Sequence, residues 1–181
     1  PGKLLSHVTV IQVRTWKKLI ICGDVAVIPA PDLEAKVAIL NYTIDVAHKL
    51  GVESPKAVLL SAVEKVNPKM PSTTDAAIIA KMADRGQIKG AVVDGPLALD
   101  VAFSQESAQI KGIKSPVAGD ADILVFPSIE AGNIFFKAST YLAEGELAAV
   151  VVGARCPCVL TSRGDSEDTK FYSIALGSLL T

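Results

Sequence analysis

The chain has 181 residues, of which half are apolar, and its formal net charge is −1. A chain of this size can bury one substantial core, about one domain with a piece of another. The near-neutral charge argues against a nucleic-acid partner and against attraction to an anionic membrane. Three cysteines, an odd number, argue against a disulfide framework and predict a reducing, cytoplasmic setting. The apolar runs are far shorter than the ~20 residues that span a bilayer.

The first part of the chain alternates between strand and helix patterns. Two β-rich runs, 8–14 and 18–23, flank a short polar link and predict a hairpin. Residues 32–51 predict a helix, and the apolar run 56–62 is typical of a parallel strand buried on both faces. The helix prediction depends on apolar residues at helical spacing, which are Leu33, Val37, Leu40, Ile44 and Ala47.

The alternation continues to the end of the chain. A helix over 71–86 is predicted, with Ser72 and Asp75 as its capping pair. Further strands are expected at 88–95, 121–127, 147–153 and 156–162, and further helices at 97–108, 130–145 and 167–180. The last of these helices carries one stripe made of Phe171, Ile174, Ala175 and Ser178. Repeated strand–helix–strand units predict an α/β protein of three layers around a mostly parallel sheet.

Four loops of this fold are candidates for function. In open parallel sheets, ligands bind at the carboxyl ends of the strands, where the loops lead into helices. The loops that fit this description are more polar than the rest of the chain, and they are 61–73, 93–96, 126–133 and 160–168.

The last loop has two readings. Ser162 and Arg163 end a predicted strand, and Asp165, Ser166 and Asp168 lead into the final helix. These side chains could cap the helix and complement its dipole. Alternatively, a hydroxyl, a fixed cation and a helix N-terminus form a site for phosphate or an oxyanion, with a carboxylate as a base.

The loop 126–133 enters its helix through Glu130, Gly132 and Asn133. Ordinary turn chemistry, with Glu130 complementing the helix dipole, explains these residues as well as a ligand site does. Lys137 lies one helical turn beyond Asn133, so both side chains could face one ligand, although a solvated lysine is the simpler reading.

Two further loops contain polar residues. Asp94 and Gly95 stand at a predicted strand end, where a turn is the default and a site the alternative. Asn67 belongs to an unusually long strand-to-helix loop, and loops of such length are often functional.

Several common sites have no support in the sequence. Neither a glycine-rich dinucleotide motif, a P-loop nor a G-x-S-x-G nucleophile elbow is present. His7 and His48 have no histidine or cysteine at metal-binding spacing, and the pair Cys156 and Cys158 stands alone. No metal site is therefore expected.

The amino-acid sequences of these loops resemble those of one protein family. The segments VEKVNPKMPSTTDA, GQIKGAVVDGPLALD, KSPVAGDADILVFPSIEAGNIFFK and VLTSRGDS are similar, in order, to the phosphate acetyl/butyryl transferase family, and most of all to its phosphate butyryltransferase branch. The likeness runs from about Ser6 to the end of the chain. It implies that the chain is the C-terminal two-thirds of such a protein.

This resemblance implies an activity. Members convert acyl-CoA and phosphate into acyl phosphate and CoA by direct attack in a ternary complex, with no tightly bound cofactor. By that likeness, Arg163 holds phosphate, Ser162 hydrogen-bonds the thioester carbonyl, and Asp165 or Asp168 is the base, with Asp165 matching the butyryl-type wording. Asn67, Asp94, Gly95, Glu130, Gly132, Asn133, Lys137 and Ser166 are then the expected substrate contacts.

The resemblance also implies an architecture like that of isocitrate and isopropylmalate dehydrogenases. Residues 20–155 would form one complete domain, while 1–19 and 156–181 would belong to a second domain that is largely missing. Homo-oligomers are expected. Asp24 is the nearest counterpart of an acidic turn in relatives, but the adjacent Pro-Ala-Pro departs from their pattern.

Two other readings stay open. A truncated, non-catalytic scaffold would keep the fold and self-assemble through apolar surface left exposed. A decarboxylating 2-hydroxyacid dehydrogenase of the same broad fold is a weaker alternative, because its cluster of metal-binding aspartates is not found in the sequence.

Overall fold

The computed structural model describes residues 4–181 and centres on one six-stranded sheet, with strand order β4-β3-β5-β2-β1-β6. Strands β2 to β5 pair in parallel, whereas β1 is antiparallel to both of its neighbours, β2 and β6. The predicted hairpin and the mostly parallel sheet are confirmed. The strands are β1 (Ser6–Gln12), β2 (Ile20–Gly23), β3 (Lys56–Leu60), β4 (Val92–Leu97), β5 (Ile123–Val125) and β6 (Glu146–Val152).

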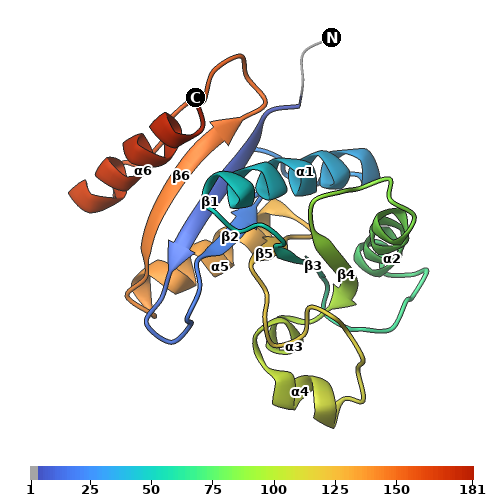
Figure 1. Ribbon diagram of the computed structural model, residues 1–181. Coiled ribbons are helices and arrows are strands. Elements are labelled where there is room, and N and C mark those ends of the chain that lie inside the picture. The colour runs from blue at the N-terminus through green and yellow to red at the C-terminus, as the bar shows by residue number, and fades with distance from the viewer. Residues whose placement is uncertain (1–3) are drawn as a thin grey trace.

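Helices cover both faces of this sheet and confirm the three-layer α/β/α prediction. One apolar core lies between the sheet and α1, α2 and α6, and the other lies between the sheet and α3, α4 and α5. In Figure 1, α1 lies in front of the sheet and α5 behind it. The helices are α1 (Leu33–Lys49), α2 (Pro71–Asp84), α3 (Leu99–Phe103), α4 (Gln105–Ile110), α5 (Ile129–Tyr141) and α6 (Glu167–Leu179).

The first helix follows the sequence pattern closely. Asp32 caps α1 by accepting a hydrogen bond from the Ala35 N–H at 2.8 Å, which satisfies one of the free donors at the helix start. The predicted stripe points at the sheet, and its members Leu40, Ile44 and Ala47 are buried. Burying side chains of this size contributes about 1.5–3 kcal/mol for each of the two larger ones.

The predicted strand 156–162 is wrong. In place of a strand, Cys158 makes one isolated antiparallel bridge to Val151. Gly153 adopts a left-handed conformation (φ +91°) that turns the chain back along β6. Pro157 has no N–H to donate, so a ladder of hydrogen bonds cannot be sustained there.

Other details of the predicted elements also differ in the structure. The predicted helix 97–108 is divided into α3 and α4 at Ser104, whose extended backbone ends one helix and whose hydroxyl caps the next. The strand expected at 88–95 is β4, which begins later because Gly90 has φ +86°. Helix α2 starts with Pro71, and Ser72 and Asp75 do not form a capping pair. Ser72 instead hydrogen-bonds Ser61, and Asp75 binds Lys36.

The proposed division into two domains stays a prediction. Strand β1 lies inside the sheet, between β2 and β6, and residues 1–3 lie outside the described residues. From residue 4 onward, no helix is long and apolar enough to cross a membrane.

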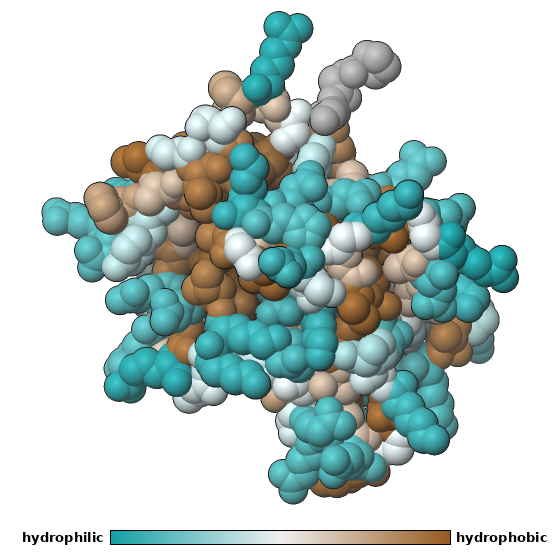
Figure 2. All heavy atoms as spheres, viewed as in Figure 1, coloured by the Kyte–Doolittle hydropathy of each residue, from teal (hydrophilic) through white to brown (hydrophobic). Residues whose placement is uncertain are grey.

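The stripe predicted on the final helix faces outward. Phe171 and Ile174 are 67% and 60% exposed, while α6 buries Ser173 and Leu176 against β6. The Ser173 hydroxyl accepts a hydrogen bond from the Ala149 N–H at 3.0 Å, so α6 also shields the free edge of β6. Figure 2 shows hydrophobic residues gathered on this side of the molecule.

A network of charged side chains lies at the N-terminal ends of β2, β3 and β5. The Asp120 carboxylate lies 2.7 Å from the Lys18 ammonium and 2.8 Å from that of Lys56, and Lys18 also contacts Asp122. Hydrogen bonds from Lys18 and Lys56 lower the pKa of Asp120 from its ordinary 3.8 to about 2. The network therefore joins the β1–β2 link, β3 and the start of β5.

Removal of the Asp120 carboxylate should lower the free energy of unfolding by an amount that depends on pH. Because the pKa of Asp120 is lower in the folded than in the unfolded state, its contribution is present above about pH 4 and is lost as pH falls toward 2. We expect Asp120→Asn to lower the free energy of unfolding by about 1 kcal/mol at pH 7, after allowance for solvent screening. Urea denaturation should show a smaller difference in the free energy of unfolding between variant and wild type below pH 3 than at pH 7. Asp84→Asn, at an exposed helix pair, is the control; an equal loss at both pH values would contradict the account.

Candidate functional site

The last loop folds back along the edge strand before it enters the final helix. After pairing with Val151 at Cys158, the chain continues to a tight turn in which the Ser162 N–H donates to the Asp165 carboxylate at 2.7 Å. The Asp165 N–H in turn donates to the Ser162 carbonyl at 3.1 Å. Asp165 therefore fixes the backbone that carries Ser162 and Arg163.

The start of α6 is capped by Ser166. Its hydroxyl oxygen accepts from the Thr169 N–H at 3.1 Å and donates to the Thr169 hydroxyl at 3.0 Å. The capping interpretation of this loop is thus confirmed for Ser166. Capping leaves other N–H groups of the first turn free to attract an anion, so it is compatible with the anion-site interpretation.

A cavity of about 280 Å³ lies between this loop and helix α5. Lys137 lines it from α5, and Asp165, Ser166 and Asp168 line it from the loop and the start of α6. The Lys137 ammonium lies 4.3 Å from the centre of the Phe136 ring, a cation–π contact that leaves its charge available at the cavity wall. Glu146 at the start of β6 adds a third carboxylate to the lining, so the cavity joins one cation, three carboxylates and a helix N-terminus.

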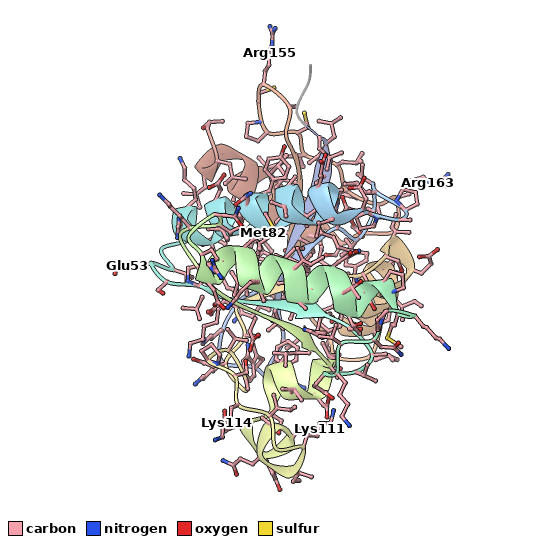
Figure 3. The ribbon with its side chains drawn as sticks, turned by 90° about the vertical axis from the view of Figure 1, so that its right-hand side faces the viewer. Glu53, Met82, Lys111, Lys114, Arg155 and Arg163 are labelled. Atoms are coloured by element: carbon pink, nitrogen blue, oxygen red, sulfur yellow. The ribbon has the colours of Figure 1, made fainter. Side chains whose placement is uncertain are left out.

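Arg163 lies beside this cavity on the exposed turn. Its side chain projects outward, well away from Lys111 and Lys114 near α4 (Figure 3). Within residues 4–181 the Arg163 guanidinium takes part in no ion pair. A free guanidinium offers a planar fork of donors that matches phosphate oxygens.

The start of α5 is packed tightly against the loop that follows β2. A Cβ at Gly132 would lie 2.5 Å from the Asp24 carbonyl oxygen, so only glycine allows this approach. The Asn133 amide donates to the Val25 carbonyl at 3.1 Å. Glu130 is exposed in the first helical turn, where a hydrogen bond from Ser128 lowers its pKa. These residues position α5, whatever else they bind.

The turn predicted at Asp94 and Gly95 is wrong, because both residues lie inside β4. A Cβ at Gly95 would come within 2.7 Å of the Leu59 Cβ, so glycine permits the close pairing of β4 with β3. The Asp94 carboxylate accepts from the Gly95 N–H at 2.8 Å. In the long loop, the Asn67 side chain accepts from the Lys69 N–H at 3.0 Å and thereby shapes the loop.

The predicted site residues therefore do not form a single cluster. Lys137, Asp165 and Ser166 share one cavity, next to Ser162 and Arg163. Asp94 lies on β4, at the opposite edge of the sheet from β6, beside which the last loop runs. The structure does not bring Asp94 to the last loop, although both were expected at strand ends.

Sequence reasoning missed a buried polar cluster under the site. The Asp24 carboxylate, 2% exposed, accepts four hydrogen bonds, from the Ser6 hydroxyl and from the N–H groups of His7, Ala26 and Val27. His7 is buried too, and its Nδ1 lies 3.1 Å from the Thr9 hydroxyl.

The environment of His7 connects this cluster to the last loop. Burial lowers the pKa of His7, and the charge of Asp24, the backbone of Leu160 and the charge of Asp165 oppose that shift in part. The period-two alternation of β1 was a usable signal, because it places His7 and Thr9 on the same face of the sheet as the buried Ile11.

The sequence that forms this fold and this loop matches a known protein family over nearly its whole length. The pattern of the family described as Phosphate acetyl/butaryl transferase matches residues 1–178, and the chain belongs to that family. The resemblance seen in the loop wording is thereby confirmed.

Two relatives and one solved structure are similar to the chain over nearly all of its residues. The chain is 50% identical over 179 residues to a phosphate butyryltransferase of Clostridium acetobutylicum and 49% identical over 178 residues to a phosphate acetyltransferase of Thermotoga maritima. It covers 60% of the length of each, and they cover 99% and 98% of it. A crystal structure of a branched-chain phosphotransacylase from Enterococcus faecalis matches 99% of the chain, with 38% identity and a TM-score of 0.88, and the match covers 65% of that structure.

Proposed function

We propose that this chain is the core of a phosphate acyltransferase that converts a short acyl-CoA, butyryl or branched, and phosphate into acyl phosphate and CoA. The observation that carries the proposal is the shared cavity of Lys137, Asp165, Ser166 and Asp168, beside the Ser162–Arg163 turn. The Lys137 ammonium, the neighbouring Arg163 guanidinium and a helix N-terminus suit phosphate, and the family relationship supports the acyl-CoA partner.

The proposed chemistry proceeds by direct attack in a ternary complex. A phosphate oxygen, held by Arg163, attacks the thioester carbonyl carbon, and the carbon–sulfur bond breaks as acyl phosphate forms. Ser162 stabilises the carbonyl oxygen while it carries negative charge. Asp165 takes the thiol proton of CoA in one direction and returns it to the thiolate in the other. Orientation of the two substrates would supply most of the rate gain.

Other expected features belong to the same proposal. No tightly bound cofactor is needed, since CoA and phosphate are substrates. The protein would act in the cytoplasm as a homo-oligomer, and the free thiols of Cys22, Cys156 and Cys158 support the reducing compartment. The predicted contacts to substrate at the start of α5, on β4 and in the long loop stay predictions; they are Glu130, Gly132, Asn133, Asp94, Gly95 and Asn67.

The test is release of CoA thiol from butyryl-CoA with and without phosphate. We expect release that depends on phosphate concentration and saturates. Cys156 and Cys158 are exposed and would react with a thiol reagent, so a protein-only baseline must be subtracted. A folded chain that releases no thiol would favour the alternative reading, a non-catalytic scaffold of the same family.

The identity of the base can be tested separately. Asp165→Asn should lower the rate of thiol release by about a hundredfold or more, because a positioned general base contributes ~10²–10⁴-fold. Asp168→Asn, at the same cavity, is the matched control and should change the rate by less than about fivefold if its role is to complement the helix dipole. The reverse ranking of the two variants would transfer the role of base to Asp168.

A further inference from the structure

A second cavity, of about 480 Å³, opens on the other flank of α5. Its floor comes from the residues that follow β3 and β5, and α3 and α5 form its sides. Nearly all its lining is aliphatic or aromatic, and the hydroxyl of its one serine, Ser61, already hydrogen-bonds Ser72 at 2.8 Å. The side chains that shape it include Leu60, Leu99, Phe126, Ile134, Phe135 and Ala138.

The position of this cavity is where the topology predicts a ligand. Strands β3 and β5 are parallel neighbours, but the chain leaves β3 toward α2 on one face of the sheet and leaves β5 toward α5 on the other. Adjacent strands whose connections diverge in this way leave a crevice at their carboxyl ends, and ligands of open α/β sheets bind in that crevice. Residues Leu60 to Ala62 and Phe126 to Pro127 lie at those two strand ends and line the cavity.

The chemistry of the lining selects the kind of ligand. Because no charged group lines the cavity, a phosphate or carboxylate would lose its hydration without gaining a partner. Its rim, in contrast, exposes large apolar side chains: Ile134 is 69% exposed and Leu99 40%. An aliphatic group seated there would cover both side chains and leave water itself.

The 280 Å³ cavity that Lys137 lines is called the anion cavity from here on, and its distance from the apolar cavity suits a short acyl chain. Ile134 at the apolar rim and Lys137 in the anion cavity are i, i+3 neighbours on α5, and such pairs have their Cβ atoms about 5–6 Å apart. We infer that this apolar cavity holds the acyl chain of the thioester while phosphate binds beside Lys137 and Arg163, and that its volume sets the preference for chain length. This inference rests on the proposed function and adds the location of acyl-chain selection.

The test combines binding and a variant that fills the cavity. Ala138→Leu adds volume inside the cavity on a helix that tolerates leucine, and Ala175→Leu makes the same change on the exposed face of α6 as a control. Binding of CoA, acetyl-CoA and butyryl-CoA would be followed by methyl NMR on isoleucine-labelled protein, with the Ile134 signal assigned through Ile134→Val. We expect butyryl-CoA, but not CoA, to shift the Ile134 methyl signal. Ala138→Leu should weaken binding of butyryl-CoA at least about fivefold and that of acetyl-CoA less than twofold.

Three distinct results would overturn the inference. If butyryl-CoA shifts other isoleucines but not Ile134, and Ala138→Leu binds it as wild type does, the acyl chain lies elsewhere while the proposed function survives. If no acyl-CoA shifts any signal of a folded protein, the proposed function fails as well. A loss of affinity in Ala175→Leu equal to that in Ala138→Leu would assign the effect to global destabilisation and would also contradict the inference.

Discussion

Replacing Arg163 with alanine is expected to lower phosphate-dependent thiol release at least about tenfold. The guanidinium has no ion-pair partner among the described residues, so the change removes a substrate contact without leaving a buried partner unpaired. Charge-assisted hydrogen bonds are worth ~1.5–3 kcal/mol, and a factor of ten in rate corresponds to about 1.4 kcal/mol. The loss should be largest at low phosphate, as a raised KM for phosphate.

Arg155→Ala provides the matched control for this experiment. Arg155 is an exposed arginine on the same return segment, and Figure 3 shows it projecting from another side of the molecule than Arg163. Its removal changes net charge by the same amount, so long-range attraction of phosphate is affected equally in both variants. Equal losses in the two variants would contradict a specific phosphate contact at Arg163.

Replacing Asp24 with alanine is expected to have the largest effect on stability. Its carboxylate is buried, and both oxygens accept two hydrogen bonds each, at 2.7–2.8 Å. The alanine variant would leave the buried Ser6 hydroxyl and His7 N–H without an acceptor, whereas the N–H groups of the exposed Ala26 and Val27 would turn to water. Breaking a buried charged network of this kind costs about 3–5 kcal/mol of the free energy of unfolding. Guanidinium denaturation followed by circular dichroism measures this difference.

Asp32→Ala is the comparison for that variant. Asp32 is an N-cap with one hydrogen bond to a backbone N–H, and its loss should cost about 1 kcal/mol. If Asp24→Ala costs no more than Asp32→Ala, water must enter and satisfy the abandoned donors, and the interpretation of Asp24 as the centre of a buried network would be wrong.

Much of the fold was predictable because its signals are local. The stripe of α1 has helical spacing, and β3 is a short aliphatic run, so their identities follow from periodicity alone. The connections between such elements are short and right-handed, so few topologies are possible. A three-layer fold around one sheet could therefore be expected. Element boundaries were less predictable, as the division at Ser104 shows, because a serine can end one helix and cap another without changing the apolar pattern.

The site could be predicted only in part, because it depends on how the chain returns after β6. The sequence of 156–162 reads as another strand, yet Gly153 and Pro157 direct the segment back along the edge of β6, and the Ser162 turn comes to lie beside α5. Lys137 could be read only as a solvated lysine or as one facing a ligand together with Asn133, because Asp165 and Asp168, which line the same cavity, are contributed by this return. The Asp24 cluster could not be predicted because two of its four donors, the Ser6 hydroxyl and the His7 N–H, come from β1, and no spacing rule connects β1 with the loop that follows β2.

Joint detection of both products would test the central claim most directly. Wild-type chain is incubated with butyryl-CoA and phosphate, free thiol is counted, and acyl phosphate is followed by phosphorus NMR in the same sample. The account predicts that thiol and butyryl phosphate appear in equal amounts and that neither appears when phosphate is omitted. Thiol released without acyl phosphate would indicate hydrolysis of the thioester and would contradict acyl transfer to phosphate at the Ser162–Arg163 turn.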